Sequence, residues 1–169
     1  QAAGEVARRH GNVHFLLAGD GVSWSNSELS GWVSTLGLRD RIYLLGRRDD
    51  VPRLTAALDL AVSASTRNEG FANVIGEAMS CGVPCVVTDV GDSASIVSDT
   101  GVVVSPGSAT RLAMAICELV ELDSGRRERM GRSARARVVA EFSIARVVAR
   151  FEALYASISE RQVLSQRSG

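Results

Sequence analysis

The sequence of 169 residues contains no lysine, so all 19 of its basic side chains are arginines. Without lysine the chain cannot form a Schiff base with a carbonyl substrate or pyridoxal phosphate, and it cannot be a P-loop protein whose lysine binds phosphate. The arginines are matched by 19 aspartates and glutamates, which leaves a formal net charge of +0. Because nucleic-acid binding favours a strongly basic domain, we expect no nucleic-acid partner.

Histidine and cysteine are also scarce. The two histidines, His10 and His14, lie away from any nucleophile motif, which argues against sites of the Ser-His-Asp or Cys-His type. The three cysteines, Cys81, Cys85 and Cys117, have no histidine nearby, so they predict small buried residues in a reducing compartment and no zinc site. We therefore expect a cytoplasmic protein that holds no metal.

Long apolar segments are missing as well. No apolar run approaches the roughly 20 residues that a membrane-spanning helix needs, and no signal peptide is present. The chain starts without Met, in what looks like the middle of a helix, so we expect it to be a piece of a longer protein. With 46% apolar residues it can bury the core of one domain, to which we assign residues 1–160, and residues 161–169 are expected to form a frayed tail.

Short apolar segments alternate with amphipathic ones through most of the chain. The apolar segments predict strands over 14–18, 41–45, 60–63, 84–88 and 101–104. Helical spacing and end signals predict helices over 27–36, 51–58, 72–81, 110–122, 126–141 and 144–158. This alternation indicates a doubly wound, Rossmann-like α/β fold, with helices on both faces of a parallel sheet and a helical C-terminal extension.

The segment after the third predicted strand carries the strongest functional signal. Ligands of doubly wound folds bind at the carboxyl ends of the strands, where this loop turns at Glu69 and Gly70 and a helix begins. The first N–H groups of that helix can bind a phosphate, and the carboxylates of Glu69 and Glu77 can accept hydrogen bonds from hydroxyls. Together these features predict a site for a nucleotide sugar. Taken singly, each glutamate is also explained as an acid near a helix start, which stabilises the helix by roughly 0.3–1 kcal/mol.

The two glutamates are separated by seven residues, with Gly70-Phe71 after the first and Ala78-Met79 after the second. This pattern resembles the E-x7-E signature of the retaining family-4 glycosyltransferases of the GT-B fold. Further segments match that family in the same order, at 15–21, 45–52, 82–91, 101–104 and 142–143. The resemblance therefore covers nearly the whole chain.

The resemblance implies the C-terminal, nucleotide-sugar-binding lobe of a two-lobed, hexosyltransferase-like enzyme. Such an enzyme transfers a sugar from a nucleoside diphosphate to an acceptor with retention, without a bound metal or other cofactor. By similarity, Glu69 is the catalytic residue beside the donor sugar and Glu77 binds the ribose hydroxyls. The other donor-binding residues that the resemblance implies are Gly70, Phe71, Ala72, Asn73, Val74, Arg48 and Asp50.

Two features of the family are absent from this sequence. The Arg and Lys that contact the diphosphate belong in and after a first strand that would precede residue 1. The lobe that would bind the acceptor, whether a glycan, a lipid or a small molecule, is absent too, so we expect the chain by itself to be inactive. Loss of a central strand predicts exposed backbone and apolar groups on its neighbours, through which the fragment can self-associate.

Two alternatives remain open, a GT-B type nucleotide-sugar epimerase lobe and a non-catalytic nucleotide-binding module. An epimerase would need more acid–base groups than this chain supplies. The arginine-rich stretch over 126–137 also leaves peripheral contact with the inner face of a membrane open. A solvated helix face with ion pairs such as Glu128–Arg132 is the simpler account.

Overall fold

The computed structural model describes residues 1–67, 70 and 72–166, with side chains described as far as Ser159. The strands are β1 (Phe15–Leu17), β2 (Ile42–Leu44), β3 (Ala61–Ser63), β4 (Cys85–Thr88) and β5 (Val102–Val104). The helices are α1 (Ala2–Arg9), α2 (Ser27–Thr35), α3 (Val51–Ala56), α4 (Asn73–Ser80), α5 (Ser93–Val97), η1 (Ser98–Thr100), α6 (Ala109–Glu121), α7 (Ser124–Phe142) and α8 (Ile144–Gln166). Each strand and helix predicted from the sequence is present within two residues of its predicted bounds, except that α8 runs further. The sequence analysis assigned no bounds to α1, α5 and η1.

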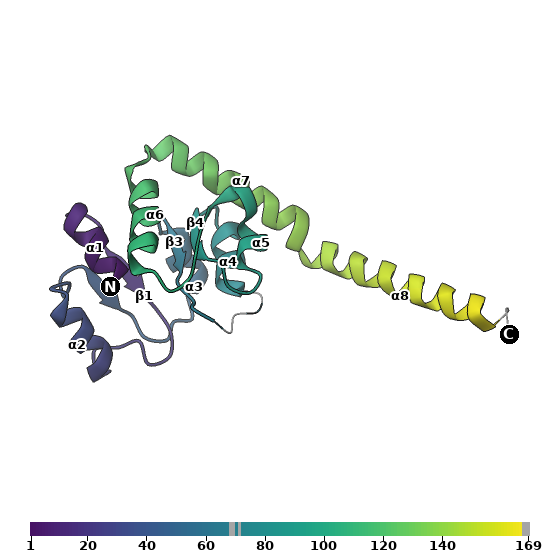
Figure 1. Ribbon diagram of the computed structural model, residues 1–169, viewed down its shortest axis with the longest axis horizontal. Helices are drawn as coiled ribbons and strands as arrows, with labels where there is room; N and C mark the ends of the chain where they lie inside the picture. The colour runs from purple at the N-terminus through teal and green to yellow at the C-terminus, as the bar shows by residue number, and fades with distance from the viewer. Residues whose placement is uncertain (68–69, 71, 167–169) are drawn as a thin grey trace.

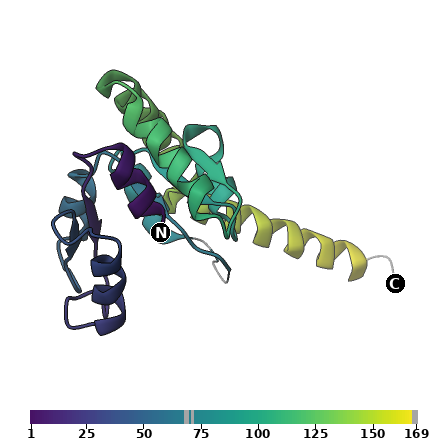
Figure 2. The same cartoon turned by 60° about the vertical axis from the view of Figure 1, so that its left-hand side comes forward.

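All strand pairs are parallel, as predicted, but they form two sheets where one was expected. β1 pairs with β2, and β4 lies between β3 and β5. The register places Leu16 opposite Tyr43 in the first sheet and Val62 opposite Val86 in the second. Figure 1 and Figure 2 show the first sheet with α1 and α2 at one end of the molecule, beside the larger second sheet.

The break between the sheets leaves two strand edges without a partner strand among the described residues. β1 bonds to β2 through alternate residues, since the Phe15 N–H donates to the Arg41 carbonyl at 2.7 Å. β3 bonds to β4 in the same way, through the Ala61 N–H and the Pro84 carbonyl at 3.0 Å. In a parallel ladder the intervening residues, Leu16 and Val62, direct their backbone groups to the opposite edge. Leu16 and Val62 are 43% and 44% exposed.

The larger sheet is covered on both faces, which accounts for its fully apolar central strand. All four residues of β4 are buried. Cys85 and Val87 pack with α4, α5 and α7 on one face, and Val86 packs with α6 and α1 on the other. Burial raises the pKa of the Cys85 thiol to about 12, so this cysteine is an inert core residue at neutral pH. Phe15 of β1 and Leu60 before β3 join the same apolar cluster beneath α1 and α6, so the two sheets share one helix layer.

The arginine-rich helix α7 is hydrogen-bonded to the ends of three other helices. Three of its arginines donate to carbonyl oxygens at or just after the C-terminal ends of other helices, where carbonyls lack partners within the helix. Arg127 bonds to Val120 in α6 and to Leu122 just after it, Arg135 to Ser80 in α4, and Arg137 to Ser95 and Ile96 in α5. The ion pair of Arg132 with Glu128 is present at 3.5 Å, as predicted.

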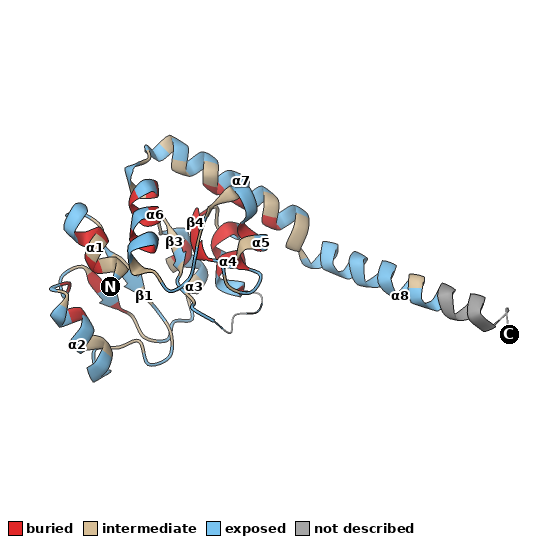
Figure 3. Ribbon diagram, viewed as in Figure 1, coloured by how far each residue is buried: buried red, intermediate tan, exposed pale blue. Residues whose placement is uncertain are grey.

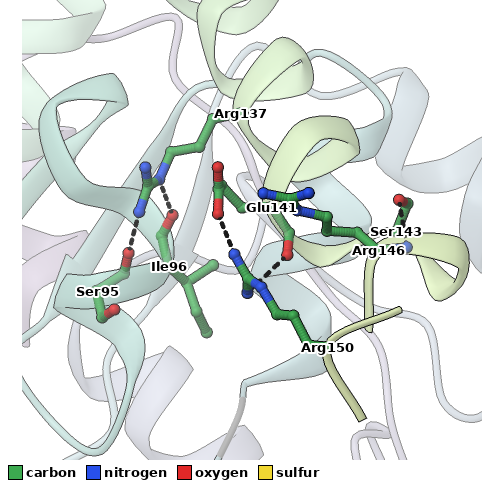
Figure 4. Close-up of polar contacts among 7 residues, drawn as sticks. All are labelled: Ser95, Ile96, Arg137, Glu141, Ser143, Arg146 and Arg150. Carbon is green, nitrogen blue, oxygen red and sulfur yellow. Dashed lines mark hydrogen bonds and ion pairs between the residues drawn. The ribbon is translucent and has the colours of Figure 1, made fainter. Parts of the chain in front are cut away.

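The last helix, α8, projects away from the domain (Figure 1). Arg150 ties its start to the end of α7 through the Glu141 carboxylate and the Glu141 carbonyl (Figure 4). Beyond this point the described part of the helix is almost entirely exposed (Figure 3). The apolar residues of this helix form an exposed stripe, at Ile144, Val147, Val148, Phe151, Leu154, Tyr155 and Ile158. The helix continues past residue 160, where a frayed tail was expected. Among the described residues, no helix has the length and apolar character needed to cross a membrane.

Candidate functional site

The loops that follow β1 and β2 are joined at the carboxyl edge of the first sheet. The Gly19 N–H donates to the Gly46 carbonyl at 2.9 Å, and the Gly46 N–H donates to the Val22 carbonyl at 2.7 Å. Arg47 and Asp20 add an exposed ion pair at 3.7 Å. Gly46 has a φ of 66°, which a residue with a side chain rarely adopts. These bonds fix the loop 46–50, which carries the predicted donor-binding residues Arg48 and Asp50, against the turn at 19–21.

The start of α4 offers backbone N–H groups at the carboxyl edge of the second sheet. Ala72 caps this helix, and its carbonyl accepts from Ile75 at 2.9 Å and from Gly76 at 3.4 Å. The next two N–H groups, of Asn73 and Val74, have no acceptor among the described residues, and both residues are exposed. An exposed helix start with free N–H groups favours an anion. The predicted role of Ala72 can rest only on its backbone, since its side chain is buried in the core.

The loop before α4 is connected to the segment after β4. The Asp92 N–H donates to the Gly70 carbonyl at 3.4 Å, and Gly70 itself is exposed. Arg67, three residues earlier, is exposed as well. The predicted catalytic residue Glu69 and the predicted donor-binding residue Phe71 lie outside the described residues.

Helix α3, which follows the loop 46–50, contacts the C-terminal end of α4. The Cys81 thiol lies 3.9 Å from the Pro52 carbonyl, at the start of α3 and two residues after Asp50. Glu77 is exposed and precedes Cys81 by four residues, so the two lie on neighbouring turns of α4.

Arg48 and Asp50 form a bidentate ion pair within their loop. Nε and Nη2 of Arg48 each donate to a carboxylate oxygen of Asp50 at 2.8 Å. The hydrogen bonds from Arg48 lower the pKa of Asp50, and the same bonds raise the pKa of Arg48. Asp50 is the N-cap residue of α3, but its side chain makes no capping bond because Arg48 occupies both oxygens. The pair is partly exposed and fixes the shape of the loop.

Two further polar residues lie at the end of β4 and after it, near the loop that leads to α4. Thr88 ends β4 and donates from its hydroxyl to the Ser65 carbonyl at 2.6 Å, which joins β4 to the loop that leads to α4. Ser93 begins α5, and its buried hydroxyl has no hydrogen-bond partner in the described structure. The sequence offered one sign that Thr88 has a polar contact, because it is the single polar residue at the end of an otherwise apolar predicted strand.

Comparison with known proteins places this fold and site in a family. The sequence profile described as "Glycosyl transferases group 1" matches residues 1–122. The chain is 34% identical over 146 residues to the N-acetyl-alpha-D-glucosaminyl L-malate synthase of Bacillus anthracis, covering 85% of this chain and 37% of that protein. It is 31% identical over 162 residues to the alpha-D-kanosaminyltransferase of Streptomyces kanamyceticus, covering 94% of this chain and 41% of the relative. The chain thus spans about two fifths of the length of these curated relatives.

Solved structures agree with these relationships. The Anabaena protein Alr3699/HepE, solved in complex with UDP and glucose, superposes with a TM-score of 0.81 at 30% identity, over 92% of this chain and 44% of that one. A C-terminal domain of a glycosyl transferase group 1 family protein from Francisella tularensis, 24% identical, has the same fold with a TM-score of 0.71, over 85% of this chain and 76% of that domain. The chain has the Rossmann-like parallel α/β fold of GT-B glycosyltransferases and belongs to the group 1 glycosyl transferase family.

Proposed function

We propose that this chain is the donor-binding domain of a retaining, family-4 glycosyltransferase that takes its sugar from a nucleoside diphosphate. The family match and the UDP-bound Anabaena neighbour support a nucleotide-sugar donor. The E-x7-E spacing of Glu69 and Glu77 supports family 4 and retention. Hexosyl transfer follows from the same resemblance.

The observation that carries the proposal is the position of Glu77. It lies in the second turn of α4, after the exposed helix start at Asn73 and Val74 and one turn before Cys81, which contacts the start of α3. In the proposed complex the diphosphate accepts from the start of α4, the ribose hydroxyls donate to Glu77, and the base lies against the backbone around Arg48 and Asp50. These three contacts follow the order of groups in a nucleoside diphosphate.

The chemistry in this proposal is divided between Glu69 and the start of α4. Glu69 contacts the donor sugar near the reacting carbon, while α4 stabilises the negative charge that develops on the leaving diphosphate. No metal or other cofactor takes part. A glycan, lipid or small-molecule acceptor is bound by a second lobe outside this chain, so the 169 residues alone transfer no sugar at a useful rate. The enzyme acts in the cytoplasm, with contact to the inner face of the membrane left open.

Calorimetric titration of the chain with UDP, GDP, ADP and TDP tests the donor site and identifies the base. One nucleotide should bind selectively. Glu77→Gln should weaken the binding of that nucleotide by roughly 1–3 kcal/mol, because a charged acceptor for the ribose hydroxyls is lost. Glu118→Gln, an exposed glutamate of α6, is the matched control and should leave the affinity unchanged. Equal binding by the Glu77→Gln variant would show that Glu77 is structural, and no binding by the folded chain would refute this site.

The proposed catalytic role is tested in the longer enzyme. Glu69→Gln should lower turnover more than donor affinity, because Glu69 is assigned to the transition state. A loss of affinity with unchanged turnover would contradict that role. The anomeric configuration of the product, followed by NMR, separates retention from inversion, and epimerised donor would support the epimerase alternative.

A further inference from the structure

Thr88 holds the loop that leads to the proposed donor site. Thr88 is the last residue of β4 and is 5% exposed. Its hydroxyl lies 2.6 Å from the Ser65 carbonyl and 3.4 Å from the Ser63 carbonyl. Since a hydroxyl donates one proton, the shorter contact with Ser65 is the main bond. Ser63 is the last paired residue of β3, so Thr88 reaches past the ladder and binds the loop itself.

A second bond holds the other end of the same loop. The Asp92 N–H, four residues after Thr88, donates to the Gly70 carbonyl, and α4 begins three residues after Gly70. Both bonds therefore come from the end of β4 and the turn that follows it. They bracket the segment between Ser65 and Gly70, which carries Arg67.

We propose that Thr88 is a positioning residue for nucleotide binding, which rests on the donor site proposed above. Thr88 touches no part of the donor in this proposal. Its hydroxyl fixes the Ser65 carbonyl, and with it the start of the chain segment that leads to α4, from whose first N–H groups the diphosphate accepts in the proposed complex. Backbone that is already anchored loses less conformational freedom when the ligand binds, and the ligand then binds more tightly.

The test compares three substitutions in titrations with the nucleotide that the chain binds. Thr88→Val keeps the shape and removes the hydroxyl, and it should weaken binding roughly 3- to 10-fold. Thr88→Ser keeps the hydroxyl and should restore the affinity to near that of the native chain. Thr100→Val is the matched control, because the Thr100 hydroxyl makes an equivalent 2.6 Å bond to the Val97 carbonyl before β5, at the opposite edge of the sheet. The Thr100→Val variant should lose about as much stability as the Thr88→Val variant, and it should keep the native affinity for the nucleotide.

A second readout requires no ligand. If the two bonds bracket one loop, Thr88→Val should speed hydrogen exchange at the Asp92 N–H, and Thr100→Val should not. Should valine prevent folding, Thr88→Ala removes the same hydroxyl without a buried methyl clash. Unchanged affinity in Thr88→Val, or an equal loss in Thr100→Val, would overturn the positioning role. Failure of the native chain to bind any nucleotide would instead overturn the proposed donor site, and this inference with it.

Discussion

Arg137 of α7 donates to the carbonyl oxygens of Ser95 and Ile96 in α5, at 2.6 Å and 2.8 Å (Figure 4). These carbonyls lie in the last turn of a five-residue helix, where no later residue of the helix can donate to them. We expect Arg137→Met to lower the free energy of unfolding by roughly 1.5–3 kcal/mol, because bonds from a charged donor to two carbonyls are lost. Chemical denaturation measures the change.

Arg129 provides the control for this substitution. It is exposed in the same helix and makes no hydrogen bond or ion pair among the described residues. Arg129→Met should change stability by less than about 0.5 kcal/mol. Equal effects of the two substitutions would mean that Arg137 contributes only its general helix propensity and charge.

Gly131 allows α7 to approach the end of α4. A Cβ atom at this position would lie 1.8 Å from the Gly82 carbonyl oxygen, which is backbone and cannot move aside. Gly131→Ala should therefore destabilise the domain by about 1–3 kcal/mol or more. Gly31, in α2, has no neighbour within 4 Å of the same atom, so Gly31→Ala should stabilise the domain by about 0.5–1 kcal/mol. Thermal unfolding of both variants tests the prediction, and shifts of the same sign would contradict it.

Asp50 should titrate below the usual range of an aspartate. Arg48 lowers its pKa in the folded state, so the stability that this pair adds is present at neutral pH and is lost as the pH falls below about 4. The carboxyl carbon of Asp50, followed by NMR, should show this low midpoint, and Arg48→Met should raise it. Arg111 is an exposed arginine of α6, and Arg111→Met should leave the titration midpoint of Asp50 unchanged. An unchanged midpoint in Arg48→Met would mean that the ion pair does not persist in solution.

The open strand edges can be tested by hydrogen exchange. The N–H groups of Phe15 and Ala61 are bonded within their sheets, whereas those of Leu16 and Val62 face the break. We expect the first pair to be protected and the second to exchange rapidly at low protein concentration. Protection of Leu16 and Val62 that grows with concentration would support the self-association expected from the sequence. Equal protection of all four at every concentration would contradict an open edge.

Most of the fold could be predicted from the sequence because its signals are local. Apolar runs such as 84–88 become strands wherever both faces of a sheet are covered, and glycines with positive φ end or turn the elements. The position of Glu77 in the second turn of α4 also followed from spacing alone. α5 has only five residues, too few to show a helical period, so no bounds were assigned to it.

The sequence by itself determined the parallel α/β fold, the position of the helix that begins at Asn73, and the glycosyltransferase family to which the chain belongs. Only the tertiary structure decided which residues meet across the chain. It placed the start of α3 beside the end of α4, directed the arginines of α7 to helix ends, and joined Thr88 to Ser65. It also divided the sheet between β1 and β3 and left the stripe of α8 exposed. Local patterns set the type of each element, but contacts between distant residues depend on how those elements pack, which no short window of sequence contains.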